Sequence, residues 1–264
     1  MKDFINTSKT LHSNEQKIYW PGAFCGTQSD TQRHWEMLKP IDDMIKTFDC
    51  KSALTIGDNL CREAAYIKKI SGCHATASDL VMGKDMHRAV EDSHVDKIIN
   101  ADIENLPFED NSIDLVLAKE TFHHWPRPML GVYEMLRVAS KCVILIEPLD
   151  GGSDSYEKVG NYQYRLSIRE IMKSAWALYL PAVAHKGFND PFAAHKGPPF
   201  DYNSWLEEKN KLDELSHAGK RNYNLAAVAI YKTPADWSFL EKDENIPLTL
   251  RPPNKHTENV KILT

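Results

Sequence analysis

The chain has 264 residues, of which 42% are hydrophobic and 26% charged, an ordinary globular composition that argues against disorder along the whole length. The formal net charge of -5 comes without any lysine- or arginine-rich run, so a nucleic-acid-binding surface is not expected. The longest apolar stretches have the length of strands and are too short to cross a bilayer.

The five cysteines are scattered, form no CxxC pair and are odd in number. This pattern disfavours a zinc site and a disulfide framework, and it fits reduced thiols. The first segment, MKDFINTSKTLHSNEQ, lacks the apolar core of a signal peptide. We therefore expect a cytoplasmic protein that binds no metal, no nucleic acid and no membrane.

The first segment with a helical pattern covers 29–48. Apolar side chains recur there at helical spacing from Trp35 to Phe48. Pro40 is expected to kink or split this helix, because proline lacks the amide hydrogen that an interior position needs. Residues 1–28 are expected to be irregular.

From residue 52 onward, short apolar runs alternate with amphipathic stretches. The expected strands are 53–57, 74–79, 97–101, 113–118 and 142–147, and the expected helices between them are 61–70, 84–91 and 129–139. This alternation predicts an α/β fold with a parallel sheet wound by right-handed crossovers. In such sheets the ligand lies at the carboxyl ends of the strands.

The alternation stops after residue 148. Beyond it, 167–180 and 205–218 have helical patterns, and 224–231 (NLAAVAIY) has the pattern of a buried final strand. The intervening segment 181–203 is rich in proline, glycine, histidine and phenylalanine and is expected to be a long loop. The end of the chain carries several prolines and is expected to be an extended tail.

The most specific pattern lies in the segment 100–148. Its pieces are, in order, Ala101-Asp102, Leu106-Pro107-Phe108, Asp110, Ser112, Asp114, His123-His124, Pro128, Glu134, Arg137-Val138 and Glu147-Pro148. The combination resembles the class I S-adenosylmethionine-dependent methyltransferases, especially those that act on small molecules, over roughly residues 50–150. The resemblance implies S-adenosylmethionine as the cofactor. It also implies a Rossmann-like fold with a mainly parallel twisted sheet, helices on both faces and an antiparallel last strand. Glu134 and Arg137, three residues apart, are expected to form a surface ion pair.

Within this resemblance, acidic residues at strand ends are the expected contacts of the adenosine. Asp79, followed by Leu80, occupies the position whose carboxylate accepts hydrogen bonds from the ribose hydroxyls. Asp102 and Ile103 occupy the position that contacts the adenine. The alternative for Asp79 is an ordinary loop aspartate that caps the next helix.

The loop after the first strand departs from the family pattern, which is D-x-G-x-G-x-G. This chain has TIGDNLC at residues 55–61, and Gly57 is the glycine that matches. Asn59 is expected to replace a second glycine, because asparagine tolerates the left-handed conformation well. Asp58 or Glu63 would then replace the acidic group that the family places before its glycines.

His123 and His124 are the candidate catalytic residues, because they follow the fourth strand, where the family holds the acceptor opposite the methyl group. A neutral histidine can accept a proton from a hydroxyl or an amine. Adjacent side chains diverge, so at most one is expected to face the substrate, and His123 is the first choice. The alternative is that one packs against the next helix and the other caps its backbone. Lys119 and Glu120, at the strand end, either line the cofactor pocket or form a solvated pair.

These patterns divide the chain into four parts. They are an N-terminal helical lid segment (1–50), a cofactor-binding core (51–150), a substrate-side insertion (151–222) and a final strand with an extended tail (223–264). The acceptor pocket is expected to be roofed by the segment 19–24 and by the insertion, since these flank the open side of the crevice.

The predicted function is methyl transfer from S-adenosylmethionine to a hydroxyl or amine of a small molecule. Within the resemblance, Glu147-Pro148 followed by the segment 160–170 is similar to bacterial methyltransferases associated with polysaccharide or sugar modification, which implies a sugar or glycan precursor as one option. The alternative is a non-catalytic methyltransferase-like binding or scaffold protein that has lost the standard cofactor loop. An NAD-dependent dehydrogenase is not expected, because no G-x-G-x-x-G follows the first strand. Nothing in the sequence indicates an oligomeric state.

Overall fold

The computed structural model of the chain describes residues 28–149, 164–191, 201–240 and 246–250. The expected roof segment 19–24, the rest of the N-terminus and most of the expected tail lie outside the described residues.

An eight-stranded sheet forms the centre of the molecule, in the order β3-β2-β1-β4-β5-β7-β6-β8. Its strands are β1 (Ser52–Ile56), β2 (His74–Asp79), β3 (Lys97–Asn100), β4 (Ile113–Lys119), β5 (Ala139–Pro148), β6 (Ala182–Phe188), β7 (Leu225–Tyr231) and β8 (Leu248–Leu250). The strands from β1 to β5 pair in parallel, whereas β7 runs antiparallel to β5 and to β6. The predicted Rossmann-like fold, mainly parallel with an antiparallel strand at 224–231, is thereby confirmed.

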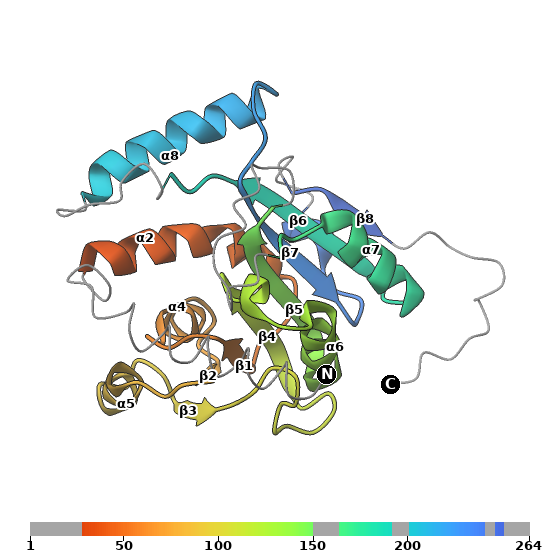
Figure 1. Cartoon of the computed structure of the whole chain (residues 1–264). Helices are drawn as coiled ribbons and strands as arrows, with labels where there is room; N and C mark the ends of the chain where they lie inside the picture. Colours follow the sequence, from red (N-terminus) through yellow and green to blue (C-terminus); the bar gives the residue numbers. More distant parts are fainter. Residues whose placement is uncertain (1–27, 150–163, 192–200, 241–245, 251–264) are drawn as a thin grey trace.

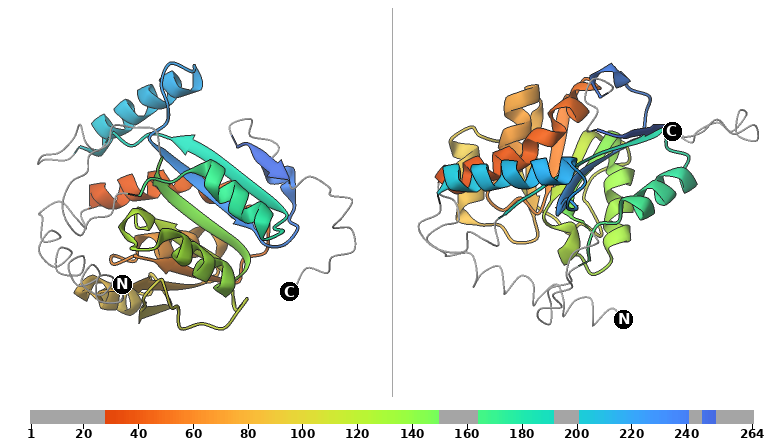
Figure 2. Two further views of the ribbon diagram at one scale, coloured as in Figure 1. Left: turned by 45° about the vertical axis from the view of Figure 1, so that its right-hand side comes forward. Right: turned by 90° about the horizontal axis from the view of Figure 1, so that it is seen from above.

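Helices cover both faces of this sheet (Figures 1 and 2). The α-helices are α2 (Gln28–Leu38), α3 (Asp42–Lys46), α4 (Arg62–Ser71), α5 (Lys84–Glu91), α6 (Pro128–Val138), α7 (Ile168–Ala177) and α8 (Tyr202–His217). Short 3₁₀ turns are η1 (Lys39–Ile41), η2 (Phe122–His124) and η4 (Trp237–Phe239). Helices α2, α4, α5 and α8 lie on one face, and α6 and α7 lie on the other (Figure 2).

Pro40 divides the first helical segment as expected. It lies in the first turn of η1, where its missing amide hydrogen costs no helical bond, and α3 begins two residues later.

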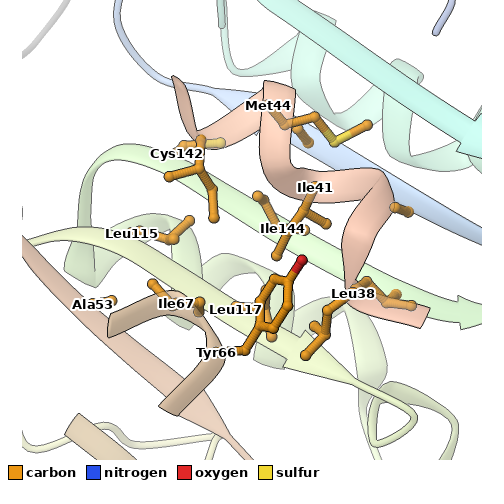
Figure 3. Close-up of a cluster of buried hydrophobic side chains, with 14 of the residues drawn as sticks. Leu38, Ile41, Met44, Ala53, Tyr66, Ile67, Leu115, Leu117, Cys142 and Ile144 are labelled. Carbon is orange, nitrogen blue, oxygen red and sulfur yellow. The ribbon is translucent and has the colours of Figure 1, made fainter. Parts of the chain in front are cut away.

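The inner strands of the parallel part are buried on both faces, and this explains the continuous apolar runs of β1, β4 and β5, whereas the edge strand β3 is partly exposed. In β4, Leu115 and Leu117 belong to the cluster under α2 and α4, whereas Val116 and Ala118 belong to the cluster under α6 and α7. Figure 3 shows Leu115 and Leu117 meeting Ile67 of α4 in the first cluster. Successive side chains of a strand point to opposite faces. A strand between two helical layers therefore favours apolar residues at every position.

The prediction of a loop throughout 181–203 is wrong for its first part, which forms β6. The strand was missed because its second half, His185-Lys186-Gly187, reads as a loop signal. Its register against the fully buried β7 explains why it is nevertheless a strand. Gly187 lies under the ring of Tyr223, where a Cβ atom would overlap the ring, so this glycine marks a close approach and not a turn. The expected tail likewise contains β8, which pairs with β6.

Candidate active site

The candidate site lies where the strand order reverses. Successive strands run outward from β1 through β2 to β3 in one direction and through β4 to β5 in the other. The connections after β1 and β4 therefore leave the sheet on opposite faces, which is the arrangement at which open α/β sheets bind their ligands. The loops that begin with Gly57, Asp79, Asp102 and Lys119 all lie at this edge, because the strands before them are parallel.

In the loop after β1, position 57 combines a left-handed backbone with a close contact that leaves no room for a side chain. Gly57 has a φ of 71°, and a Cβ atom there would lie 2.5 Å from Thr121 Oγ1, in the loop after β4. The second left-handed residue of the loop is Cys61, with a φ of 55°, so the expectation that Asn59 takes this conformation is wrong. Cys61 is the N-cap residue directly before α4, so the left-handed residue lies two positions closer to the helix than Asn59.

Asp58 holds the loop against the helix that follows. Its Oδ2 atom accepts hydrogen bonds from Thr55 Oγ1 and from the backbone amide of Ala64, both at 2.9 Å. The carboxyl group is buried, and burial together with the negative charge of Glu63 raises its pKa well above the usual range. Through this bond Asp58 caps the first turn of α4, whose Cys61 offers no side-chain cap.

Asp79, at the end of β2, has one carboxylate oxygen that is hydrogen-bonded and one to which no described residue donates. Its Oδ1 accepts a hydrogen bond from the amide of Val81 at 2.9 Å. Its Oδ2 is buried, and among the described residues no group hydrogen-bonds to it. Burial raises the pKa of Asp79 to about 6. The capping alternative does not apply, since the next helix, α5, begins at Gly83 without a side-chain cap.

The end of β3 is tied to the end of β2. Asn100 donates from Nδ2 to the carbonyl of Leu80 at 2.7 Å, and the amide of Ala101 donates to the carbonyl of Asp79 at 3.0 Å. Asp102 then accepts from the amide of Glu104 at 3.0 Å, a tight turn that buries Ile103 in the cluster under α6. Asp79, Leu80, Asp102 and Ile103 are therefore carried by two strand ends that are fixed to each other.

The ion pair of Glu134 and Arg137 forms as expected, at 2.9 Å, and it also holds the loop before β4. Glu134 accepts from the amide of Leu106 at 3.0 Å, and Arg137 donates to the carbonyl of Phe108 at 2.7 Å. The Leu-Pro-Phe segment is thus clamped to α6, and the role of the pair is structural.

His123 is paired with a buried carboxylate. Its Nδ1 atom lies 2.6 Å from Oε2 of Glu147, a residue that is 0% exposed at the end of β5. The other carboxylate oxygen of Glu147 accepts from the amides of Thr121 and Phe122 at 2.6 and 2.8 Å. Burial lowers the pKa of His123, but the charge and the hydrogen bond of Glu147 outweigh it and raise the pKa overall. The rings of His123 and His124 lie 4.0 Å apart, so the expectation that the two side chains diverge is wrong.

A buried ion cluster joins α2 and α4 to the end of β4. Its members are Asp30, Arg33, His34, Arg62, Glu63, Lys119, Glu120 and Asp190. Lys119 has a side chain that is 1% exposed, and its Nζ lies 2.7 Å from His34 Nδ1 and 3.6 Å from Glu63 Oε1. The alternative of a solvated Lys119 is therefore wrong. Burial and the charge of Lys119 lower the pKa of His34 to about 4, so this histidine is neutral near pH 7.

Comparison with known proteins shows which family the sequence around this site resembles. The sequence pattern of the methyltransferase domain family matches residues 54–146, from within β1 to within β5. Residues 54–146 therefore match a class I S-adenosylmethionine-dependent methyltransferase domain.

The relatives of this methyltransferase domain are distant. The chain is 25% identical over 125 residues to the glycine/sarcosine/dimethylglycine N-methyltransferase of Actinopolyspora halophila. That match covers 45% of this chain and 22% of the relative, so the chain spans about a fifth of the length of the curated protein it matches.

Two solved structures illustrate the shared fold. The 1,6-didemethyltoxoflavin-N1-methyltransferase of Burkholderia thailandensis has 14% identity and a TM-score of 0.56, over 87% of this chain and 90% of that one. The magnesium protoporphyrin IX methyltransferase of Synechocystis PCC 6803 has 12% identity and a TM-score of 0.52, over 86% and 97%. At this level of identity the likeness concerns the fold alone.

The carboxyl-terminal edge of the sheet has a hydrogen-bond acceptor that suits an adenosine. Ribose hydroxyls are hydrogen-bond donors, and Asp79 presents a buried acceptor atom that no described group satisfies. The sequence did not reveal that Glu147 pairs with His123 or that His34 contacts Lys119. A signal for Glu147 was present, because a charged residue that ends a buried strand needs a partner.

Two absences concern the described part of the chain. It contains no cluster of three or more His, Cys, Asp or Glu side chains able to hold a metal ion. Among these same residues, no helix has the length and apolar character needed to cross a membrane.

Proposed function

We propose that the chain transfers the methyl group of S-adenosylmethionine to a hydroxyl or amine of a small molecule. The observation that carries this proposal is the buried, unsatisfied Oδ2 atom of Asp79 at the carboxyl end of β2. When bound, S-adenosylmethionine supplies a sulfonium-bound methyl group that a nucleophile can take up. The ribose hydroxyls would donate to Asp79, beside Leu80.

The other strand ends would hold the remaining parts of the cofactor. Asp102 and Ile103 are proposed to contact the adenine, since they follow the strand next to Asp79. The loop residues Gly57, Asp58 and Asn59 are proposed to hold the methionine part. Oδ2 of Asp58 is occupied by the loop itself, whereas its buried Oδ1 has no hydrogen-bond partner among the described residues and could accept from the ligand.

Lys119 is proposed to act on the methionine part from the opposite side of the crevice. It ends β4, the strand next to β1, and its ammonium group stands in the buried ion cluster with Glu63 and Glu120. A buried cation within such a cluster exerts a stronger field than the same cation in water.

His123 is proposed as the base, with His124 as the second candidate. If Nδ1 of His123 donates to Glu147, the lone pair of Nε2 remains to accept the proton that the acceptor loses as it is methylated. Glu147 would fix this tautomer and hold the ring in place. The rest of the rate would come from holding the donor and the acceptor in line.

The test is calorimetric titration with S-adenosylmethionine, in the unmodified chain and in Asp79→Asn. The substitution keeps the size of the side chain but removes its charge. Losing a charge-assisted hydrogen bond of about 1.5–3 kcal/mol should weaken binding about 10-fold to 100-fold. Asp96→Asn, a change of another aspartate that precedes β3 on the opposite edge, is the matched control and should bind normally. Equal affinity in Asp79→Asn and the unmodified chain would contradict the assignment.

The second candidate function is a non-catalytic binding or scaffold protein. The observation that favours it is the loop after β1, which bends at Cys61 and has a single glycine. Absence of any binding of S-adenosylmethionine or S-adenosylhomocysteine at millimolar concentration would decide for this candidate. The prediction of a sugar or glycan acceptor rests on 160–170, of which 160–163 lie outside the described residues, and it stays a prediction. The cytoplasmic location also stays a prediction.

A further inference from the structure

A cavity lies beside the proposed base, between η2 and α6 on one side and α7 on the other. Its volume is about 360 Å³, which falls within the range of roughly 300–1,000 Å³ for sites that bind small molecules. Apolar side chains dominate its lining, and they include Phe122, Met129, Leu130, Leu166 and Ile171.

Both walls of the cavity are bonded to the residues around Glu147. Phe122 donates from its amide to Glu147 Oε1 at 2.8 Å, and it belongs to the same 3₁₀ turn as His123. On the opposite wall, the amide of Leu166 donates to the carbonyl of Pro148 at 2.8 Å. His123 and Glu147 do not themselves line the cavity, but residues on both of its walls are hydrogen-bonded to the strand end that carries Glu147.

The charges on the lining are few and unevenly placed. Arg127 forms a two-point ion pair with Glu104, at 3.1 and 2.8 Å, so its charge is largely compensated. Arg165 also lines the cavity, and its positive charge acts on His123 from that side. Glu170 contributes a carboxylate at an exposed position of the lining. Arg165 is thus a cation of the cavity lining whose charge also reaches the proposed base.

We infer that this cavity binds the methyl acceptor, and that the acceptor has an apolar body and an anionic group that pairs with Arg165. The inference rests on the proposed function, of which it names the substrate class. An unmodified sugar fits this lining poorly. Its hydroxyl groups would lose their water against Phe122, Met129 and Leu166 without gaining partners.

The test uses a pair of fluorescent probes that differ in one charge. The first is 1-anilinonaphthalene-8-sulfonate, which is apolar and anionic, and the second is N-phenyl-1-naphthylamine, its neutral counterpart. In Arg165→Gln the anionic probe should bind about tenfold or more weakly, since a charge-assisted contact is lost, while the neutral probe binds as before. Arg169→Gln is the matched control, because Arg169 is an exposed arginine of α7 outside the lining.

A second variant locates the probes. Leu130→Trp fills the cavity from α6 and should weaken both probes at least tenfold, and thermal unfolding shows whether each variant is folded. Equal effects of Arg165→Gln and Arg169→Gln on the anionic probe would overturn the inference. So would unchanged binding of both probes in folded Leu130→Trp. Titration with S-adenosylmethionine is read separately, so failure of the proposed function is distinguishable from failure of this site.

Discussion

At the scale of single residues, the proposed base His123 is paired with the buried carboxylate of Glu147. One carboxylate oxygen of Glu147 accepts hydrogen bonds from two backbone amides, and the other is bonded to the imidazole of His123. The carboxylate is therefore fixed before any ligand binds. A fixed acceptor on Nδ1 favours the tautomer whose Nε2 can take a proton.

The first prediction concerns the pKa of His123. Glu147 raises this pKa and burial lowers it, so Glu147→Gln should leave burial alone and move the pKa below its usual value of about 6.5. The amide oxygen of glutamine can still accept from the amides of Thr121 and Phe122. The measurement is a proton NMR titration of the imidazole resonances, assigned with His124→Ala. An unchanged or higher pKa in Glu147→Gln would contradict the assigned pair.

The second prediction concerns the pH dependence of cofactor binding. The ribose hydroxyls would donate to an ionised Asp79, whose pKa burial raises to about 6. Affinity for S-adenosylmethionine should therefore fall as pH falls through this value, by about tenfold between pH 7.5 and pH 5. In Asp79→Asn the affinity should be weaker and flat over this range. Calorimetry at each pH measures both, and a parallel fall in the variant would assign the dependence to another group.

At the scale of elements, the loops after β1 and β4 touch through Gly57. The third prediction compares two glycine substitutions with similar backbone strain. Gly57 and Gly72 have φ values of 71° and 69°, but only at Gly57 does an added Cβ meet another atom within 4 Å. Gly72→Ala should cost about 1–2 kcal/mol of unfolding free energy, the strain of a left-handed residue.

Gly57→Ala should cost clearly more than Gly72→Ala, because Thr121 must also move, and it should weaken S-adenosylmethionine binding, which Gly72→Ala leaves intact. Urea unfolding measures the first effect and calorimetry the second. Equal losses of stability in both variants would show that the two loops are not in contact.

The fourth prediction concerns the attachment of α2. Arg33 pairs with Asp190, which also accepts from Trp205 of α8 at 2.8 Å, and Figures 1 and 2 show α2 and α8 side by side. Removing one partner of a buried pair leaves an uncompensated charge, so Arg33→Ala should lower the unfolding free energy by about 3–5 kcal/mol. Lys46→Ala breaks an exposed pair and should cost under about 1 kcal/mol. Urea unfolding of both variants is the measurement, and a loss in Arg33→Ala as small as in Lys46→Ala would show that the buried pair does not hold α2.

At the scale of the whole molecule, the sequence predicts the parallel core well and its surroundings poorly. Strands buried on both faces leave continuous apolar runs, so β1, β2, β4 and β5 are visible in a single chain. Strands β6 and β8 are not visible in this way, because the pairing of β6 with β7 and of β8 with β6 decides their conformation.

The same reason limits prediction of the site. Asp79 and Asp102 follow strands and can be placed by their position in the alternation. The ion cluster cannot, because it joins residues as far apart as Arg33 and Asp190, which are separated by 157 positions. Pairings of this kind follow from the packing of α2 on the sheet and leave no local pattern.

The measurement that tests the account most directly is a crystal structure of the chain with S-adenosylhomocysteine. The account predicts the ribose hydroxyls within hydrogen-bond distance of Asp79 Oδ2, with the adenine against Asp102 and Ile103. It also predicts the sulfur atom on the side of the crevice that faces His123. A ligand bound elsewhere, or with its ribose away from Asp79, would contradict the central claim that the carboxyl ends of β1, β2 and β4 form the cofactor site.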